Sequence, residues 1–422
     1  MRQMADINLA GSIQERLPEE LAALLRSASE IATERGQGIF LVGGIVRDLI
    51  LGRPNLDIDL VVEGDAIAVA RELAEIKPGK LTVHPRFKTA KIRWGNLSLD
   101  FASARSETYA VPGALPTVTM STIEDDLRRR DFTINAMAVC LDSSRFGELL
   151  DVYGGRDDLE KRLIRVLHDQ SFTDDATRIW RALRYEQRLD FNLEEDTLAL
   201  LKRDIARLDT ISGDRVRYEL ECVFHEDYPE RVLSRAEELG VLAKLHPALR
   251  SDAWLSQKFM ELRKMPGKAS PSFTLYLALF AYRLEVPERE ALIRCLRLTK
   301  PVSKLLREID TIKPKLKKLS YPELKPSYIY RQLHGHSLPV IITAMLATSS
   351  PLVCQHIRIY YDKLRYVKSF LDGDYIVSKG VLPGPRVKEI LTQLLEAKLD
   401  GKATTREGEK MLLGVLLSDN TR

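Results

Sequence analysis

The stretch FLVGGIVRDLILGRPNLDIDLVVEG, residues 40–64, constrains the fold more than any other part of the chain. Residues 38–44 form a short apolar run that enters a double glycine, which predicts a buried strand followed by a turn. Residues 47–52 predict a helical turn that ends at Gly52. Residues 56–64 alternate between apolar and polar positions and predict a second strand. The chain therefore begins with a unit of strand, helix and strand.

Two aspartates on the second of these strands are candidates for metal binding. Asp57 and Asp59 are two positions apart, so on a strand both carboxylates point to one face. Adjacent carboxylates repel one another unless they are protonated or bind a cation. A pair fixed on a strand suits Mg²⁺, and two such ions about 4 Å apart could promote an in-line displacement at phosphorus. The alternative is a surface strand with two solvated acids, because an Asp-x-Asp pattern is common.

Residues near the aspartates suit the binding of a phosphate group. Gly43 and Gly44 would let backbone N–H groups approach a phosphate closely, and the Arg47 guanidinium could bind the same anion. Together with the aspartates, this pattern predicts a site for a triphosphate and its metal ions. Asp100 lies on a later predicted strand and is a candidate third carboxylate, able to bind metal or to deprotonate a hydroxyl nucleophile. An acid at the edge of a strand would look the same.

The sequence pattern changes near residue 155. Up to that point predicted strands and helices alternate, and beyond it almost only helical periodicity is present. We therefore expect an α+β N-terminal region with a mixed sheet, followed by an all-α remainder. The other elements predicted in the N-terminal region are a helix over 19–35, strands over 80–94 and 97–105, a loop over 106–118, and a helix leading into a strand over 125–141.

The composition is that of a soluble globular protein. The 422 residues are 45% hydrophobic and 29% charged, and at about 100–200 residues per domain they suffice for two to four domains. The formal net charge of +4 means that a nucleic-acid surface must be a local patch. The four cysteines lie far apart, which argues against structural zinc or disulfides and fits a reducing cytoplasm. We expect neither a signal peptide nor a membrane span, because no stretch approaches about 20 apolar residues.

Four motifs occur in an order that resembles a known enzyme family. They are LVGGIVRDLILG…LDIDLVV, RRDFTINAMAV, DVYGGRDDLEKRLIRVL and DDATRIWRALRYEQRLDF, and they span about residues 38–222. In these motifs the chain is similar to the class II tRNA nucleotidyltransferases and to the bacterial poly(A) polymerases related to them. The later stretch GVLPGPRVKEILTQLLEAKLDGKATTREGE resembles the tail segment of many members more loosely.

The resemblance implies both a domain organisation and an activity. The expected parts are a catalytic head of nucleotidyltransferase fold over residues 1–155, a helical neck with a base-reading motif over 156–230, and a helical RNA-binding body and tail over 231–422. The implied activity adds CMP or AMP from CTP and ATP to the 3′ end of tRNA, with Mg²⁺ and without a nucleic-acid template, and releases pyrophosphate.

The resemblance also assigns roles to residues of this chain, position by position. Asp57 and Asp59 would bind metal. Gly154 and Gly155 would build the turn into the neck. The implied nucleotide-binding residues are Gly44, Arg47, Arg130, Asp131, Asn135, Asp175, Arg178, Arg181 and Arg184, among which Arg130 and Asp131 would hold the triphosphate and ribose.

The chemistry of Asp175 and Arg178 explains how such a pair could select bases. At i and i+3 they would share one face of a helix. A carboxylate only accepts hydrogen bonds and a guanidinium only donates them. Cytosine and adenine offer an amino donor where uracil and guanine have a carbonyl oxygen, so the pair would accept C and A. Rejecting U and G would rest on about 1–3 kcal/mol for each unpaired buried group. The alternative is an ion pair on a helix face, worth about 0.2–0.5 kcal/mol.

Basic residues mark two further regions. The stripe of Arg178, Arg181, Arg184 and Arg188 recurs at three- and four-residue steps and would line one helical face near the triphosphate. In the helical half, the stretches 313–332 and 357–370 combine lysines and arginines with aromatic residues. These stretches suit contacts with the phosphates of a tRNA, although solvated helix faces have a similar composition.

Several functions are compatible with these motifs. The leading one is a nucleotidyltransferase acting on the 3′ end of tRNA. A bacterial poly(A) polymerase would have the same head, and a specialised enzyme would add only CC or only A. The segment 104–118 bears on this choice, because family members differ there. A catalytically inactive RNA-binding protein would not need the retained aspartates and arginines, and a small-molecule nucleotidyltransferase would not need so long a basic helical half.

Overall fold

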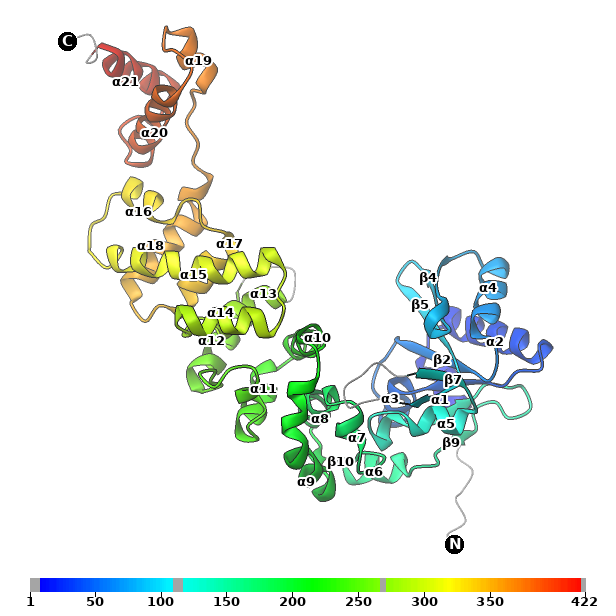
Figure 1. Cartoon of the computed structure of the whole chain (residues 1–422). Helices are drawn as coiled ribbons and strands as arrows, with labels where there is room; N and C mark the ends of the chain where they lie inside the picture. The colour runs from blue at the N-terminus through cyan, green and yellow to red at the C-terminus, as the bar shows by residue number, and fades with distance from the viewer. Residues whose placement is uncertain (1–7, 109–116, 266–270, 419–422) are drawn as a thin grey trace. The chain divides into compact units, whose positions relative to one another are not determined.

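The computed structural model describes residues 8–108, 117–265 and 271–418 of the chain. Two compact units make up the fold: Met1–Asp227 with Glu238–Lys244, and Tyr228–Glu237 with Leu245–Arg422. Within the described residues, every strand belongs to the first unit, and the second unit is helical (Figure 1). The α+β class predicted for the N-terminal region is confirmed. The finer division into head, neck, body and tail stays a prediction.

A mixed sheet of seven strands forms the centre of the first unit. The strand order is β3-β4-β5-β2-β1-β8-β9. Strands β2 and β5 run parallel, and the other neighbouring pairs are antiparallel. The strands span Ile39–Val42 (β1), Ile58–Val62 (β2), Lys80–His84 (β3), Thr89–Trp94 (β4), Leu97–Ser103 (β5), Ala138–Cys140 (β8) and Leu149–Leu150 (β9).

Helices pack around the sheet, and the helix predicted over 19–35 is present. Helix α2 (Glu19–Glu34) packs on α4 (Ala66–Ile76), which lies against β4 and β5 (Figure 1). Helix α3 (Gly44–Leu51) follows β1 directly and packs against α1 (Ala10–Arg16). It ends at Gly52, whose left-handed conformation has a φ of 68° and suits a residue without a Cβ. The predicted strand–helix–strand unit is therefore confirmed.

Two local predictions are wrong. The single strand expected over 80–94 is the antiparallel hairpin of β3 and β4, interrupted by a 3₁₀ turn at Pro85–Phe87. Proline lacks the N–H that a strand ladder requires. The loop expected over 106–118 contains strand residues at both ends, because β6 (Arg105–Thr108) and β7 (Thr117–Met120) pair with each other. The middle of that segment, 109–116, lies outside the described residues.

Helices dominate from residue 155 onward, as predicted. Gly154, with a φ of 71°, precedes α6, and a Cβ on Gly155 would lie 2.3 Å from the Thr133 carbonyl oxygen, so the predicted glycine turn is present. One exception to the all-α expectation is a parallel pair of two-residue strands, β10 and β11. The pair forms because the left-handed Asp190 (φ 60°) ends α8. The elements are α5 (Ile123–Arg128), α6 (Gly155–Lys161), β10 (Leu163–Ile164), α7 (Ser171–Asp174), α8 (Thr177–Leu189), β11 (Asn192–Leu193), α9 (Glu195–Asp204) and α10 (Gly213–Phe224).

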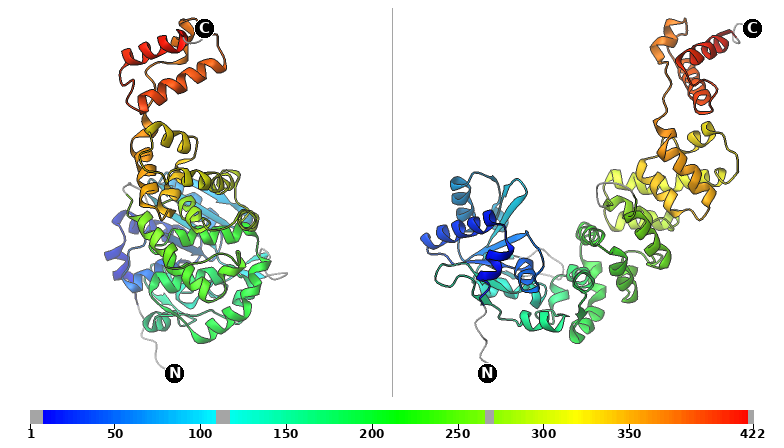
Figure 2. Two further views of the ribbon diagram at one scale, coloured as in Figure 1. Left: turned by 90° about the vertical axis from the view of Figure 1, so that its left-hand side faces the viewer. Right: turned by 180° about the vertical axis from the view of Figure 1, so that it is seen from behind.

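The second unit is built from helices, and two of its apolar cores lie in its C-terminal part. The larger core gathers apolar residues of α15 to α18, and the smaller one gathers those of α19 to α21. Figure 2 shows α20 and α21 packed side by side. The helices are α11 (Pro229–Glu238), α12 (Ala253–Arg263), α13 (Phe273–Phe280), α14 (Val286–Cys295), α15 (Lys300–Lys318), α16 (Pro326–Leu333), α17 (Leu338–Ala347), α18 (Pro351–Asp362), α19 (Gly373–Ser378), α20 (Pro385–Leu399) and α21 (Arg406–Ser418).

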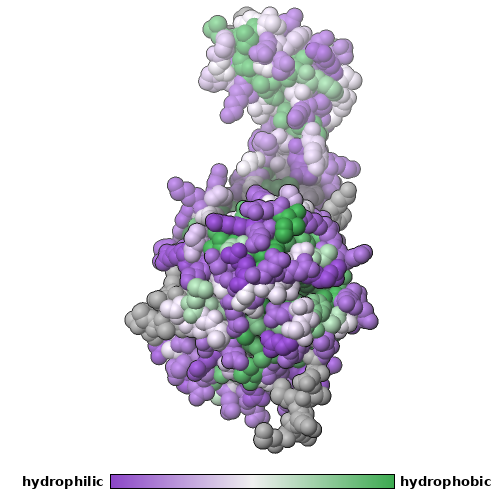
Figure 3. Space-filling view, turned by 90° about the vertical axis from the view of Figure 1, so that its right-hand side faces the viewer, coloured by the Kyte–Doolittle hydropathy of each residue, from purple (hydrophilic) through white to green (hydrophobic). Residues whose placement is uncertain are grey.

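The face of the molecule shown in Figure 3 is mainly hydrophilic. Apolar side chains gather on this face only in small groups. Across the described ranges, no helix combines the length and the apolar character that crossing a membrane requires.

Candidate active site

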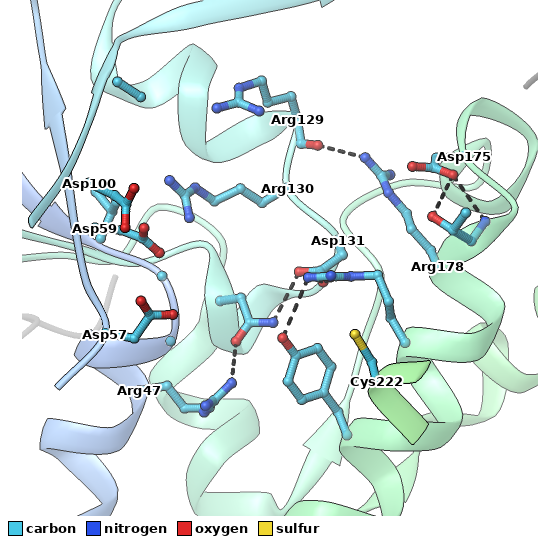
Figure 4. Close-up of a pocket in the computed structure, with 18 of the residues that line it drawn as sticks. Arg47, Asp57, Asp59, Asp100, Arg129, Arg130, Asp131, Asp175, Arg178 and Cys222 are labelled. Atoms are coloured by element: carbon cyan, nitrogen blue, oxygen red, sulfur yellow. Dashed lines mark hydrogen bonds and ion pairs between the residues drawn. The ribbon is translucent and has the colours of Figure 1, made fainter. Parts of the chain in front are cut away.

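A cavity of about 1120 Å³ in the first unit contains every predicted site residue. Its walls come from the turn between β1 and α3, the strands β2 and β5, the segment after α5, and the helices α8 and α10. The predicted residues that line it are Gly43, Gly44, Arg47, Asp57, Asp59, Asp100, Arg130, Asp131, Asn135, Asp175, Arg178, Arg181 and Arg184. Residues spread over much of the first unit therefore share one space (Figure 4).

The sheet places three carboxylates at one side of this cavity (Figure 4). Asp59 on β2 is the direct partner of Asp100 on β5 in the parallel ladder, so the two side chains point to the same face. Asp57 lies one residue before β2 rather than on it, and its N–H donates to Asn55 Oδ1 over 2.8 Å. The prediction that Asp57 is a strand residue is wrong, but it lies at the same end of the cavity.

The charge of this carboxylate group is incompletely balanced. Burial raises the pKa of Asp59 to about 6, and repulsion from Asp57 and Asp100 adds to the rise against the opposing charge of Arg130. Lys91 on β4 donates to Asp100 Oδ2 over 2.5 Å. One cation thus satisfies Asp100, whereas Asp59 stays in a negative environment that a further cation would relieve.

The turn at Gly43 allows an arginine to approach the carboxylates. Gly43 has a φ of 77°, and a Cβ there would lie 2.8 Å from Arg130 Nη1. Asp126, which is fully buried, accepts hydrogen bonds from Arg129 and Arg130. Burial disfavours the charged form of Asp126, but the two guanidinium groups outweigh it and lower its pKa. Asp126 therefore holds both arginines at the cavity wall.

A buried hydrogen-bonded chain connects Arg47 with α8. Arg47 donates to Asp48 through Nε and Nη2, each over 2.9 Å, and to Asn135 Oδ1 over 2.8 Å. Asn135 in turn donates to Asp131 Oδ1, and Arg181 pairs with Asp131 Oδ2 over 2.6 Å. Burial opposes ionisation of Asp131, but Arg181 and Asn135 lower its pKa to about 2. Arg47 is only 3% exposed, so its phosphate contact stays a prediction, whereas its hold on Asn135 is present in the structure.

The proposed base-reading residues are fixed by separate partners. Asp175 lies in extended backbone between α7 and α8, so the expectation that it shares a helix face with Arg178 is wrong. Its Oδ1 accepts from the N–H and hydroxyl of Thr177, and its Oδ2 accepts from Arg215 Nη2 over 2.7 Å. Arg178 donates to Ser171 Oγ over 2.7 Å and to the Arg129 carbonyl oxygen over 2.6 Å. Among the described residues, neither residue bonds to the other, which contradicts the ion-pair alternative.

The chain matches known sequences over most of its length. Residues 39–165 match the Poly A polymerase head domain, and residues 190–252 match a domain described as the probable RNA and SrmB-binding site of polymerase A. The A-adding tRNA nucleotidyltransferase of Halalkalibacterium halodurans is 34% identical over 390 residues, covering 91% of this chain and 90% of that protein. The chain belongs to the tRNA nucleotidyltransferase family.

Other members of the tRNA nucleotidyltransferase family agree with this assignment. The A-adding tRNA nucleotidyltransferase of Geobacter sulfurreducens is 36% identical over 97% of this chain, but the chain spans only 48% of that longer protein. A CCA-adding enzyme in an apo form has a TM-score of 0.82 and 33% identity, with 98% of this chain and 100% of that one covered. A Thermotoga maritima CCA-adding enzyme complexed with tRNA has a TM-score of 0.77 at the same identity and coverage. Complexes of CCA-adding enzymes with ATP and CTP are also similar, at TM-scores of 0.81 and 0.79.

The carboxylates at the sheet side of the cavity suit Mg²⁺. In the part of the chain that the structure describes, no group of three or more acidic, histidine or cysteine side chains forms a ready-made metal cage. Mg²⁺ usually takes one or two carboxylates and completes its shell with water and substrate phosphates. Asp57 and Asp59, with Asp100 in register beside Asp59, fit that requirement.

Several supporting residues of this site were not predicted from the sequence. Lys91, Asp126, Arg129 and Arg215 each hold a predicted residue in place. Arg215 begins the RVRYEL stretch of α10. The sequence alone did not indicate that the fold places Arg215 beside Asp175, which lies 40 positions earlier in the chain. Lys91 would have required the register of β4 against β5.

Proposed function

We propose that the chain transfers CMP, AMP or both from CTP and ATP to the 3′ end of tRNA and releases pyrophosphate, without a nucleic-acid template. The observation that carries the proposal is one cavity with carboxylates at one side and Asp175 with Arg178 at the other (Figure 4). Family membership supports it, because related CCA-adding enzymes have been solved with ATP, CTP and tRNA.

The carboxylate side of the cavity suits the transfer step. Asp57 and Asp59 would hold Mg²⁺, which would neutralise charge on the phosphates and orient them. The RNA 3′ oxygen would attack the α-phosphorus, and the bond to the leaving pyrophosphate would break. Asp100, which forms an ion pair with Lys91 over 2.5 Å, would take the proton of the 3′ hydroxyl. Arg130 would stabilise negative charge on the phosphates.

The base-reading side is held rigidly but keeps free hydrogen-bonding capacity. A carboxylate offers about four lone-pair sites, and the described partners of Asp175 use three of them. Arg178 has five N–H groups, and its described partners use three. One acceptor site and two donors thus remain for a base edge. An amino group of cytosine or adenine would donate to Asp175, and a ring nitrogen would accept from Arg178.

A-addition alone is one specific form that relatives support. Two relatives that match more than nine tenths of this chain, at 36% and 34% identity, are A-adding enzymes, whereas a CCA-adding enzyme solved with CTP matches 98% of the chain at 34% identity. A CCA-adding enzyme of Leuconostoc citreum matches 91% of the chain at 27% identity. Residues 109–116, in the segment expected to bear on the subtype, lie outside the described residues. Poly(A) addition is the second candidate, because the head matches a poly(A) polymerase domain.

The second unit offers residues that suit RNA binding. Arg365 lies over the rings of Tyr361 and Tyr366, at 4.3 and 4.4 Å, and Lys398 lies over Phe370. Tyr366 is 64% exposed. Exposed aromatic rings beside cations suit both stacking on bases and contacts with phosphates. The four cysteines form no disulfide with one another, which supports a reducing cytoplasm as the place of action.

The deciding experiment incubates the purified chain with tRNA ending at the discriminator base, at C, or at CC, and with each labelled NTP singly. An A-adding enzyme extends only the CC-ended tRNA and only with ATP. A CCA-adding enzyme extends all three with the matching nucleotide, and a poly(A) polymerase adds AMP repeatedly. Pyrophosphate should be released one for one. Failure to extend any RNA, or release of free phosphate in place of pyrophosphate, would refute the proposed reaction.

A further inference from the structure

Tyr185 on α8 is surrounded by arginine side chains within the cavity. Its ring centroid lies 5.2 Å from Arg47 Cζ and 5.7 Å from the Cζ atoms of Arg181, Arg184 and Arg188. All five residues line the cavity, and Tyr185 is 8% exposed. Each cation lies within about 6 Å of the ring centroid, where the ring quadrupole attracts it.

Acidic residues fix the outer sides of these guanidinium groups. Four cations around one ring repel each other, so their approach needs compensation. Beyond the ring itself, it comes from carboxylates: Asp48 pairs with Arg47 over 2.9 Å, Asp131 with Arg181 over 2.6 Å, and Glu226 with Arg184 over 3.5 Å and with Arg188 over 2.5 Å. Each of the four guanidinium groups therefore contacts both the aromatic ring and a carboxylate.

Arg184 has longer ion pairs than the other three arginines. It is 6% exposed, and its Nε lies 3.5 Å from Glu226 Oε1 and its Nη1 3.7 Å from Glu219 Oε2. Neither Arg184 Nε nor Glu219 Oε2 makes a hydrogen bond among the described residues. A buried guanidinium with such long contacts suits an anionic ligand that would complete its hydrogen bonding.

We propose that Tyr185 is a positioning residue that holds these four guanidinium groups together as a binding surface for the triphosphate of any nucleotide. The inference rests on the proposed function, because the ligand is the triphosphate of the incoming NTP. The ring acts through the arginines and reads no base, since Asp175 and Arg178 have other partners. Its removal should therefore weaken all nucleotides and pyrophosphate by similar factors.

The test compares Tyr185→Phe, Tyr185→Leu and the control Phe40→Leu by equilibrium binding of ATP, CTP, UTP, GTP and inorganic pyrophosphate. Tyr185→Phe keeps the ring and should stay within about twofold of the wild type. Tyr185→Leu removes the ring and should weaken every ligand about tenfold, as expected for the loss of partly desolvated cation–π contacts. Phe40 is a buried ring of the head core, so Phe40→Leu should lower the melting temperature and leave binding unchanged.

A second series keeps the shape of the side chain. Phenylalanine and its mono-, di- and trifluorinated forms at position 185 weaken the ring quadrupole stepwise without removing packing against Phe132, whose ring lies 5.8 Å away edge to face. Pyrophosphate affinity should fall with each fluorine. Constant affinity along the series, or equal losses in Tyr185→Phe or Phe40→Leu, would overturn the positioning role. A wild type that binds neither NTP nor pyrophosphate would refute the proposed function itself.

Discussion

Asp59 and Asp131 line the same cavity, yet the protein shifts their pKa values in opposite directions. At the sheet side, burial and the neighbouring carboxylates raise the pKa of Asp59 to about 6. At the α8 side, burial is outweighed by Arg181 and Asn135, and the pKa of Asp131 falls to about 2. The protein's own cations outweigh burial at Asp131, whereas at Asp59 they do not outweigh burial and the neighbouring carboxylates.

This difference assigns different tasks to the two sides. A group whose partners are all protein atoms keeps its geometry when no ligand is bound, which suits the binding of a nucleotide in one orientation. A cluster with excess negative charge gains most from binding metal, which suits chemistry at a phosphate. The predictions below test whether substitutions on each side affect only the matching property.

The largest effect is expected at the sheet side. Asp59→Asn should lower the rate of nucleotide transfer about a thousandfold, because several kcal/mol of charge stabilisation by the metal would be lost, at about 1.36 kcal/mol per tenfold. Its stability should stay equal or rise, because a repelling carboxylate is removed. A single-turnover assay in Mg²⁺ measures the rate of transfer, and urea unfolding measures the stability. Asp214→Asn, at the cavity but paired with Arg217 over 3.0 Å, is the matched control. Near-normal transfer by Asp59→Asn would show that Asp59 is not a required metal ligand.

At the other side, Asp175→Ala should change nucleotide choice before it changes the chemistry. Discrimination against UTP and GTP should fall about tenfold to a hundredfold, since the unpaired acceptor that rejects them is worth about 1–3 kcal/mol. The measurement is kcat/KM for each of the four NTPs. An unchanged order and ratio of the four values, with activity still measurable, would show that Asp175 does not read the base.

The ion pair of Asp131 with Arg181 should also contribute pH-dependent stability. Because the pKa of Asp131 falls from 3.8 to about 2 on folding, its ionised form stabilises the protein above pH 4 by about 2 kcal/mol. That contribution is lost as the pH falls from about 4 to 2. The free energy of unfolding in urea should therefore differ between the wild type and Asp131→Asn by a constant amount from pH 7 to 5. This difference should become smaller below pH 4. A difference in the free energy of unfolding that is as large at pH 3 as at pH 7 would show that the ionised form of Asp131 does not supply this stability.

The smallest effect is expected at a residue that only holds a proposed base-reading residue in place. Arg215→Ala should free Asp175 Oδ2 and lower discrimination against UTP and GTP about threefold to tenfold, close to the net value of one typical hydrogen bond of about 0.5–1.5 kcal/mol. Arg217→Ala is the control on the same helix, because Arg217 pairs with Asp214 and Glu221. Equal losses in both variants would indicate a general disturbance of α10.

The sequence predicted the site better than it predicted the supports of the site. Residues such as Asp59 and Arg178 are identified by local spacing together with the family resemblance, and the predicted nucleotide- and metal-binding residues line one cavity. Local spacing fails where backbone geometry changes between elements, so Asp175 was expected on a helix and lies in extended backbone. It also fails for partners from distant elements. Arg215 reaches Asp175 across 40 positions, and Lys91 faces Asp100 only through the strand register.

The parallel register of β2 and β5 has a consequence for how the gene can vary. Asp59 and Asp100 face each other although a helix and a hairpin lie between them in the chain. Insertions or deletions in the connections before β5 would leave this pairing intact. A single codon inserted within β5 ahead of Asp100 would turn its carboxylate to the opposite face of the sheet. Natural length variation should therefore accumulate in the connections and be excluded from these two strands.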